Sequence, residues 1–346
     1  MLTMVPCEQF LAILGTVCLL ASCERAPESA SVQELTGSAM GTAYSVKIVA
    51  PPARLNIASL RADIDRELAQ IEQQMSTYIA DSELSQFNAY RGVDWFEVPI
   101  ELCRVVVEAL SISAASGGAF DITVGPLVNL WGFGPGGGVT VPPDPHRIVA
   151  LMDSVGHAAL HADCSVPALR KGRPDVYVDL SAIAKGYGVD RVAAILDAQQ
   201  VQNYLVEIGG DLRVLGKNSR GENWSIAIES PTRSARSVHA IIKMNRAAVA
   251  TSGDYRNYFE HEGSYYSHTI DPRTGFPVAH NGAAVTVVAD NAAYADALAT
   301  GLLVLGPEDG LEFAERRKIA AYYLLRNDGV IEERYSSLFA AEVSLQ

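Results

Sequence analysis

The chain has 346 residues, nearly half of them hydrophobic and 19% charged, which is enough apolar material for one large domain or two closely packed lobes. Asp and Glu together number 40 against 27 Lys and Arg, so the formal net charge is −13. Because no Lys- or Arg-rich run interrupts this acidity, the sequence argues against a nucleic-acid partner.

The first 22 residues are predicted to be an export signal, and the next residue a site of lipid attachment. Residues 10–21 form an apolar run that is too short to span a bilayer, and the run leads into Leu20-Ala21-Ser22-Cys23. Cleavage before Cys23, as in a bacterial lipoprotein, would leave its thiol for a diacylglycerol group. A plain secretory peptide or a membrane anchor is the alternative. Residues 1–10 depart from the usual signal pattern, since they contain no Lys or Arg. The polar segment 23–34 is expected to be a tether.

Hydrophobic periodicity predicts the elements of the first half of the remaining chain. Alternating apolar residues predict a half-buried strand over 43–49. Apolar residues from Leu60 to Met75 recur three or four positions apart, which is typical of an amphipathic helix. A second helix is predicted around 102–110, with its end at Ser116-Gly117-Gly118. Residues 130–145 are rich in Gly and Pro and are expected to form a loop. We also predict a strand over 176–180 and a helix after it.

From about Tyr204 the pattern indicates mostly strands. Two helices are then predicted near 292–304 and 307–317, followed by a hairpin around Asn327-Asp328-Gly329. Strands mixed irregularly with helices favour an α+β fold over repeated βαβ units. The predicted strands are 204–208, 212–215, 224–229, 239–243, 247–251 and 284–288.

Two other features of the sequence, a glycine-rich run and a pair of cysteines, indicate less. Residues 132–137 match the letters of a dinucleotide-binding G-x-G-x-x-G motif, but Val139-Thr140-Val141-Pro142-Pro143 follows where a helix is required, so this function is not expected. After removal of the signal and lipidation of Cys23, Cys103 and Cys164 would remain. They could pair in an oxidising compartment, although nothing in the sequence requires it.

The run Tyr266–Gly275 contains a histidine, an aspartate and an arginine within six positions. Asp271-Pro272 and Thr274-Gly275 predict a turn that holds these groups in one geometry. His268 has an ordinary pKa near neutrality and could act as a base. The alternative is a histidine with a purely structural role.

Two further runs contain groups suited to phosphate or metal. In the run 178–190, a strand is expected to lead through small residues into a helix, a common place for phosphate or metal, and Lys185 could contact an anionic ligand or lie at the surface. Asp296 and Thr300 lie four residues apart on a predicted helix, so both face the same side. Their oxygen atoms suit Mg²⁺. The alternative for Asp296 is a favourable charge near a helix start.

Together these runs resemble the FAD:protein FMN transferases, once called thiamine biosynthesis lipoproteins. The resemblance covers roughly residues 35–335. Besides the three runs above, it rests on Gly37-Ser38-Ala39-Met40-Gly41-Thr42, Met75-Ser76-Thr77-Tyr78, Ser82-Glu83-Leu84-Ser85-Gln86-Phe87-Asn88 and Gly118-Ala119-Phe120-Asp121-Ile122-Thr123.

The resemblance implies a transferase domain over 35–346, with two lobes and a flavin cleft between them. Such an enzyme uses Mg²⁺ at the pyrophosphate of FAD, moves the FMN moiety onto a threonine hydroxyl of an acceptor flavoprotein and releases AMP. The acceptor would be a subunit of a membrane redox pump or a secreted flavoprotein, and the enzyme would be lipid-anchored on the periplasmic side of the bacterial cell membrane. The alternatives are a Mg²⁺-dependent FAD pyrophosphatase and a non-catalytic FAD-binding lipoprotein.

The resemblance also assigns roles to individual residues. His268 corresponds to the candidate catalytic histidine. Asp296, Thr300 and a carbonyl of the turn 181–184 would hold the metal, with Ala182 as the first choice for that carbonyl and Ala184 as the second. Tyr78 and Phe120 offer flat faces for a flavin or adenine ring, or are ordinary core residues. The residues that match flavin contacts are Met40, Tyr78, Ala119, Phe120, Asp121, Asp179, Lys185 and Ile270.

Overall fold

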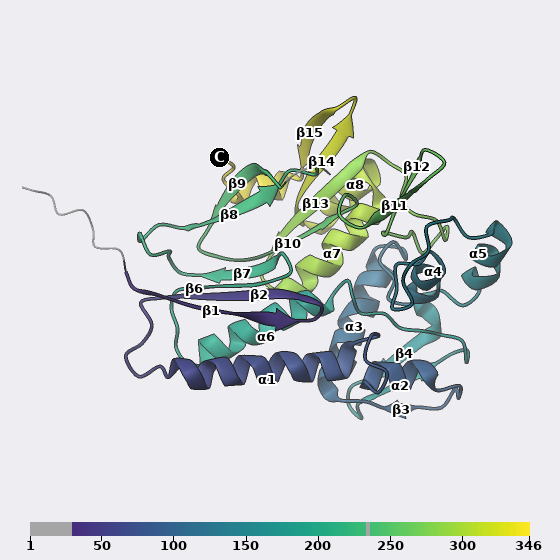
Figure 1. The fold of residues 1–346 in the computed structure, drawn as a ribbon, viewed down its shortest axis with the longest axis horizontal. Helices are drawn as coiled ribbons and strands as arrows, with labels where there is room; N and C mark the ends of the chain where they lie inside the picture. The colour runs from purple at the N-terminus through teal and green to yellow at the C-terminus, as the bar shows by residue number, and fades with distance from the viewer. Residues whose placement is uncertain (1–29, 233–235) are drawn as a thin grey trace, which may run out of the picture.

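The computed structural model describes residues 30–232 and 236–346 (Figure 1). The predicted signal segment and Cys23 lie outside the described residues. The first strand, β1 (Val32–Ala39), begins inside the segment 23–34 that we expected to be a tether, and it pairs along its whole length with β2 (Thr42–Val49).

An eight-stranded sheet forms the larger lobe, and every pair of neighbouring strands in it is antiparallel. The strand order is β1-β2-β6-β7-β10-β13-β14-β15, so segments far apart in the sequence lie side by side. The bounds of the other six strands are β6 Tyr204–Ile208, β7 Asp211–Leu215, β10 Arg246–Gly253, β13 Gly282–Ala289, β14 Ala320–Asn327 and β15 Val330–Tyr335.

Helices α1 (Ile57–Met75), α6 (Ala184–Ala198) and α7 (Ala292–Leu305) cover one face of this sheet (Figure 1). Helix α7 lies on β10 and β13 and also packs against α6. Its buried positions are largely alanine and glycine, and these small side chains let its backbone come close to its neighbours. Helix α8 (Pro307–Arg317) follows directly. Among the described residues, no helix has both the length and the apolar character needed to span a bilayer.

A second apolar core lies against the opposite face of the sheet. The hairpin of β8 (Trp224–Glu229) and β9 (Val238–Met244) and the helix α9 (Ser337–Glu342) supply its outer layer. Phe339 of α9 is fully buried and stacks on Tyr322, at 5.1 Å between ring centroids. The sheet is therefore covered on both faces.

The smaller lobe contains short elements around α3 (Ile100–Ala115). The aromatic hairpin β11–β12 belongs to this region because Trp131, which follows α4, packs with Phe259 and Tyr266 of the hairpin. The other elements are α2 Glu83–Ala89, α4 Gly125–Leu130, α5 Pro145–Met152, η1 His157–Ala159, β3 Phe96–Glu97, β4 Leu160–Asp163, β5 Ala168–Lys171, β11 Tyr258–His261 and β12 Ser264–Ser267.

The predicted elements are present with one exception. Residues 176–180 are extended and mostly buried, but they belong to no sheet, so the predicted strand is wrong. The side-chain amide of Asn88 donates to the carbonyl of Val178 at 2.8 Å and accepts from its N–H at 2.7 Å, and Asp179 N–H donates to Ile122 at 2.8 Å. One asparagine therefore replaces the strand partner that the apolar pattern suggested.

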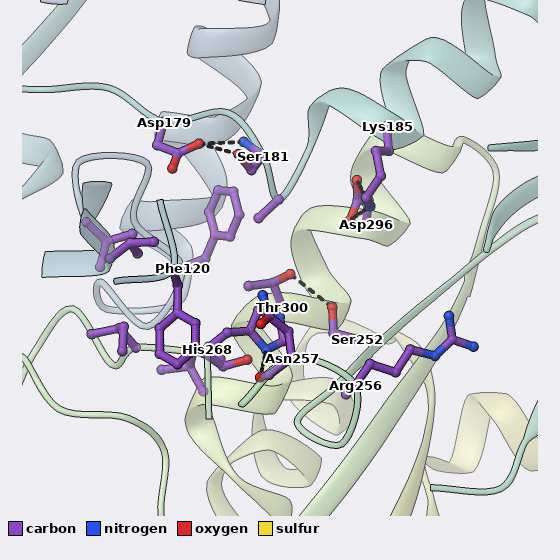
Figure 2. A pocket seen from close by; sticks show the side chains of 18 of the residues that line it. Phe120, Asp179, Ser181, Lys185, Ser252, Arg256, Asn257, His268, Asp296 and Thr300 are labelled. Atoms are coloured by element: carbon purple, nitrogen blue, oxygen red, sulfur yellow. Dashed lines mark hydrogen bonds and ion pairs between the residues drawn. The ribbon is translucent and has the colours of Figure 1, made fainter. Parts of the chain in front are cut away.

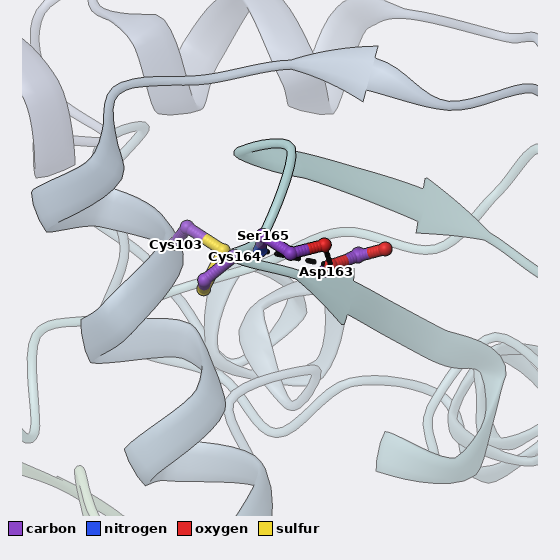
Figure 3. Close-up of a disulfide and its surroundings, with 4 residues drawn as sticks. All are labelled: Cys103, Asp163, Cys164 and Ser165. Atoms are coloured by element: carbon purple, nitrogen blue, oxygen red, sulfur yellow. Dashed lines mark hydrogen bonds between the residues drawn. A yellow bond between two sulfur atoms is a disulfide. The ribbon is translucent and has the colours of Figure 1, made fainter.

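The structure contains a disulfide between Cys103 of α3 and Cys164, the residue after β4 (Figure 3). The Cα atoms are 5.8 Å apart and the cysteines are separated by 61 residues. The sequence had left this pairing open. The bond joins the main helix of the smaller lobe to its three-stranded sheet.

Loss of the disulfide is expected to destabilise the protein. The double variant Cys103→Ser/Cys164→Ser should lose about 2–4 kcal/mol of unfolding free energy, because the bond restricts a long loop of the unfolded chain. Urea unfolding of the oxidised wild type and the variant would measure this, and reductant should shift only the wild type. Equal midpoints would show that the bond contributes nothing.

Candidate functional site

A cavity of about 510 Å³ lies between the two lobes, and most of the residues predicted for the site line it (Figure 2). Met40 is the exception. It occupies the β1–β2 turn with φ 53°, its N–H donates to the carboxylate of Glu72, and it is not part of the cavity wall. The predicted residues that do line the cavity are Tyr78, Ala119, Phe120, Asp121, Asp179, Ala182, Lys185, His268, Ile270, Asp296 and Thr300.

Lys185 lies between two buried carboxylates at the upper wall of the cavity. It lies in the first turn of α6, and its Nζ is 2.5 Å from Asp211 of β7 and 3.4 Å from Asp296 of α7. Gly186 makes this arrangement possible, because a Cβ at that position would lie 2.1 Å from the carbonyl oxygen of Ala292. The two helices therefore approach closely, and Gly186 N–H donates to Asp296 at 3.1 Å.

The charges in this group depend on one another. Burial opposes the charged form of Lys185, but the carboxylates of Asp296 and Asp211 raise its pKa above the usual value. Burial and the charge of Asp296 raise the pKa of Asp211 to about 7, against the opposing effect of Lys185. Lys185 therefore remains a cation near neutral pH, held where an anionic ligand in the cavity would meet it.

Oxygen atoms suited to a hard cation continue along α7. Thr300 lies one turn after Asp296, and its hydroxyl is 3.0 Å from that of Ser252. No group of three His, Cys, Asp or Glu side chains among residues 30–232 and 236–346 could by itself hold a metal. A cation here would therefore need hydroxyl, carbonyl or substrate oxygens in addition to Asp296. This mixed, oxygen-only set fits Mg²⁺, which is commonly bound by one or two carboxylates with substrate phosphates and waters.

The turn before α6 supplies the candidate carbonyls. The carboxylate of Asp179 accepts from the N–H of Ser181 at 2.9 Å and from its hydroxyl at 2.5 Å, which holds the turn in shape. Ala182 lines the cavity, whereas Ala184 is the first residue of α6 and does not line it. Of these two residues, only Ala182 therefore belongs to the cavity wall.

Asp121 is buried in the opposite wall, and its carboxylate is already saturated with hydrogen bonds. One oxygen accepts from the N–H and hydroxyl of Thr123, and the other accepts from the N–H of His157 at 2.7 Å and lies 3.1 Å from its Nδ1. Its side chain therefore holds the loop 119–123 in place, and that loop forms the wall.

The two aromatic candidates differ in exposure. Phe120 is only 2% exposed and packs against Gly301 of α7, so its ring is largely part of the core. Tyr78 is 67% exposed at the cavity and presents a free ring face. Partial burial and the nearby charge of Asp179 raise the pKa of Tyr78. Tyr78 is therefore the better candidate to stack on a planar ring.

His268 lies across the cavity from Lys185 (Figure 2). Its Nδ1 is 3.0 Å from the carbonyl oxygen of Asn257, so Nδ1 carries the proton and Nε2 has the free lone pair. The ring of Phe133 packs against it edge to face at 6.2 Å. Burial lowers the pKa of His268 below its ordinary value of 6.5, against the opposing effect of the Asn257 hydrogen bond. The imidazole is therefore neutral at pH 7, as a base must be.

The turn at Asp271 forms as predicted. The N–H groups of Thr274 and Gly275 donate to the carbonyl of Asp271 at 3.2 and 2.8 Å, and Gly275 has φ +80°. Arg273 makes a bidentate ion pair with the carboxylate of Asp271. This pair stabilises the turn that follows His268.

Sequence reasoning missed Asp211, Ser252, Arg256 and Asn257. A signal for Asp211 existed, because Gly209 and Gly210 precede it with φ 60° and 100°, and such a glycine pair marks a tight turn. No comparable signal marks the other three, since the pairing of β10 with β7 and β13 brings them to the cavity. The guanidinium of Arg256 pairs with Glu229, another residue of the cavity wall.

Comparisons with known proteins find relatives over most of this chain. The model of the ApbE family matches residues 40–323. An FAD:protein FMN transferase of Vibrio cholerae serotype O1 is 43% identical over 334 residues, which cover 96% of this chain and 98% of the relative. The solved structure of the flavin transferase ApbE from Vibrio cholerae has a TM-score of 0.84 and 42% identity, over 90% of this chain and 99% of that one. The apo flavinyl transferase ApbE of Pseudomonas stutzeri gives 0.82 and 39%, over 90% and 97%.

Proposed function

The chain belongs to the ApbE family, and from this membership we propose that it is an FAD:protein FMN transferase. The enzyme takes the FMN moiety of FAD, attaches it to a threonine hydroxyl of an acceptor flavoprotein and releases AMP. The observation that carries this proposal is one cavity that joins a neutral histidine, an ammonium group and a cluster of carboxylate and hydroxyl oxygens.

The charge of the cavity supports a requirement for Mg²⁺. Asp179, Asp211 and Asp296 lie in or beside the wall, and Lys185 offsets only part of their charge. A pyrophosphate would be repelled from such a site without an added cation. Asp296, Thr300 and the carbonyl of Ala182 are the groups that would hold Mg²⁺. Bound there, the ion would neutralise phosphate oxygens and make the phosphorus more electrophilic.

His268 would activate the acceptor. Its Nε2 accepts the proton of the threonine hydroxyl as the threonine oxygen forms a bond to the phosphorus of the FMN moiety. The bond from that phosphorus to the oxygen of AMP breaks, and the electron pair leaves with AMP. The Asn257 carbonyl stabilises the imidazolium through Nδ1–H. Lys185 supplies a fixed positive charge to the phosphate oxygens.

We place the protein on the periplasmic side of the bacterial cell membrane, held by a lipid on Cys23. The apolar run that leads into Cys23 motivates this proposal. The Cys103–Cys164 disulfide supports it, since such bonds persist in oxidising compartments.

Incubation with FAD, Mg²⁺ and an acceptor domain should add the mass of FMN to one threonine of the acceptor. Asp296→Asn should abolish this transfer and weaken Mg²⁺ binding measured by calorimetry with FAD present, whereas the exposed Asp290→Asn should change neither. Rapid formation of free FMN with no labelled protein would favour a pyrophosphatase. Absence of AMP in every mixture would favour a binding protein.

His268→Ala should reduce transfer by about 10² to 10⁴-fold while FAD still binds, because general base catalysis has this magnitude. His239→Ala, which alters a histidine paired with Glu333 away from the cavity, is the matched control. The part of the pH–rate profile that depends on His268 should fall off below pH 6.5, since activity requires the neutral imidazole and burial lowers its pKa. Loss of rate below pH 6.5 that persists unchanged in His268→Ala, or transfer by His268→Ala at the wild-type rate, would assign the base elsewhere.

The variant Cys23→Ser should appear in the soluble periplasmic fraction or remain unprocessed, because it cannot accept the lipid. Fractionation and mass analysis of the mature N-terminus would test this. A soluble wild type with a free Cys23 thiol would rule out the anchor.

A further inference from the structure

An ion pair between Asp254 and Arg326 lies behind the cavity wall, where neither residue lines the cavity. Asp254 is 5% exposed. Its two carboxylate oxygens accept from the two terminal nitrogens of Arg326, at 2.6 and 2.9 Å. This bidentate arrangement is the most directional form of ion pair available to a protein.

The pair joins a segment without regular secondary structure to the main sheet. Residues 254–257 connect β10 to β11 and belong to no helix or strand. Arg326, in contrast, lies on β14 in the main sheet, where its N–H donates to Asn281 at 2.8 Å. The guanidinium therefore joins a connecting segment to a rigid strand. The hydroxyl of Tyr265 adds a bond to the carbonyl of Asp254.

The same segment ends at the residue that orients His268. The carbonyl of Asn257 accepts from the N–H of His268 at 3.1 Å and from its Nδ1 at 3.0 Å. A displacement of this carbonyl would free the ring to rotate and would remove the preference for a proton on Nδ1. Nε2 would then lose its role as the available base.

We propose that Asp254 and Arg326 are positioning residues for His268, acting through the carbonyl of Asn257. The proposal rests on the proposed function in so far as His268 is the base. The ion pair fixes the place of the carbonyl, the carbonyl fixes the tautomer and direction of the imidazole, and neither member of the pair touches the substrate.

Loss of Asp254 and loss of Arg326 should have opposite effects on the pKa of His268. The charged groups that act on His268 are Asp254, which favours the imidazolium, and Lys185, which opposes it. Phe133 and Asn257, which contact the ring, carry no charge. Removal of Asp254 alone takes away a negative charge, whereas removal of Arg326 alone leaves that charge unopposed. The two changes should therefore move the acidic limb of the rate profile in opposite directions.

The test uses the full-length enzyme with Asp254→Asn, Arg326→Met and Arg326→Lys. The control is Arg191→Met. This change breaks the ion pair between Arg191 and Glu67, whose atoms are 2.6 Å apart and which does not line the cavity. We expect Asp254→Asn and Arg326→Met to lower kcat by roughly 10- to 100-fold, the cost of misplacing a catalytic group by about 1 Å. The KM for FAD should not change. The acidic limb of the pH–rate profile should move to lower pH in Asp254→Asn and to higher pH in Arg326→Met. Arg326→Lys should restore part of kcat.

A measurement without substrate separates this proposal from the proposed function. Nitrogen NMR of ¹⁵N-histidine-labelled enzyme without FAD should show His268 protonated on Nδ1 in the wild type and in Arg191→Met. Arg326→Met should show a mixture of tautomers. If Arg326→Met does not fold, Asp254→Asn should show the mixture of tautomers instead, and Arg326→Lys should lie between Asp254→Asn and the wild type.

Three results would overturn the proposal. These are an unchanged tautomer in the folded variants, acidic limbs that move in the same direction, and a loss of kcat in Arg191→Met as large as in Arg326→Met. If the wild type lacks transfer activity, the proposed function fails, while the NMR comparison still decides whether the pair orients His268.

Discussion

The close contact between α6 and α7 at Gly186 is the constraint on which the site depends. A side chain at this position would collide with the backbone of α7, so only glycine allows the helices to approach. Their approach brings Lys185 within reach of Asp296 and leaves both beside Asp211. Burial of three charges in one place is costly unless they satisfy one another. The helix contact therefore determines both the shape of the cavity wall and its charge.

The two walls of the cavity have different physical characters. The wall formed by α6, α7 and β7 carries charges that are held by helices and by a strand of the main sheet. The wall formed by residues 119–123 and 133 is made of loops, and buried polar side chains such as Asp121 hold it in shape. A rigid charged wall suits phosphate groups, whereas a wall of loop backbone and aromatic rings suits a planar ring system.

The elements with strong periodicity could be predicted from the sequence, and those held by single side chains could not. Helix α1 and strands β6 and β8 follow directly from apolar spacing. Residues 176–180 have the same apolar character, but the Asn88 amide replaces the pairing strand, and no local pattern encodes that contact. Short strands such as β3 contain too few residues to show a period.

The site residues also fall into those that could be predicted from the sequence and those that could not. Asp296, Thr300, Lys185 and His268 stand in distinctive runs, so the sequence indicated them and the fold brings them to one cavity. Asp254 and Arg326 are 72 residues apart, and only the tertiary structure relates them to His268. Residues that stand in a distinctive run could be found from the sequence, whereas residues that reach the site only through the pairing of distant segments could not.

The disulfide closes a loop of the chain, and hydrogen bonds within that loop close a shorter one. Residues 103 and 164 bracket the bonds of Asp121 and Thr123 to His157 and Gly156. The entropic cost of closing a loop grows with the length of the flexible chain between the two joined residues. Because the disulfide already closes the longer loop, the hydrogen bonds of Asp121 and Thr123 join segments that are held near each other. Oxidation therefore makes one wall of the cavity easier to assemble, while the charged wall opposite, outside this loop, forms without its help.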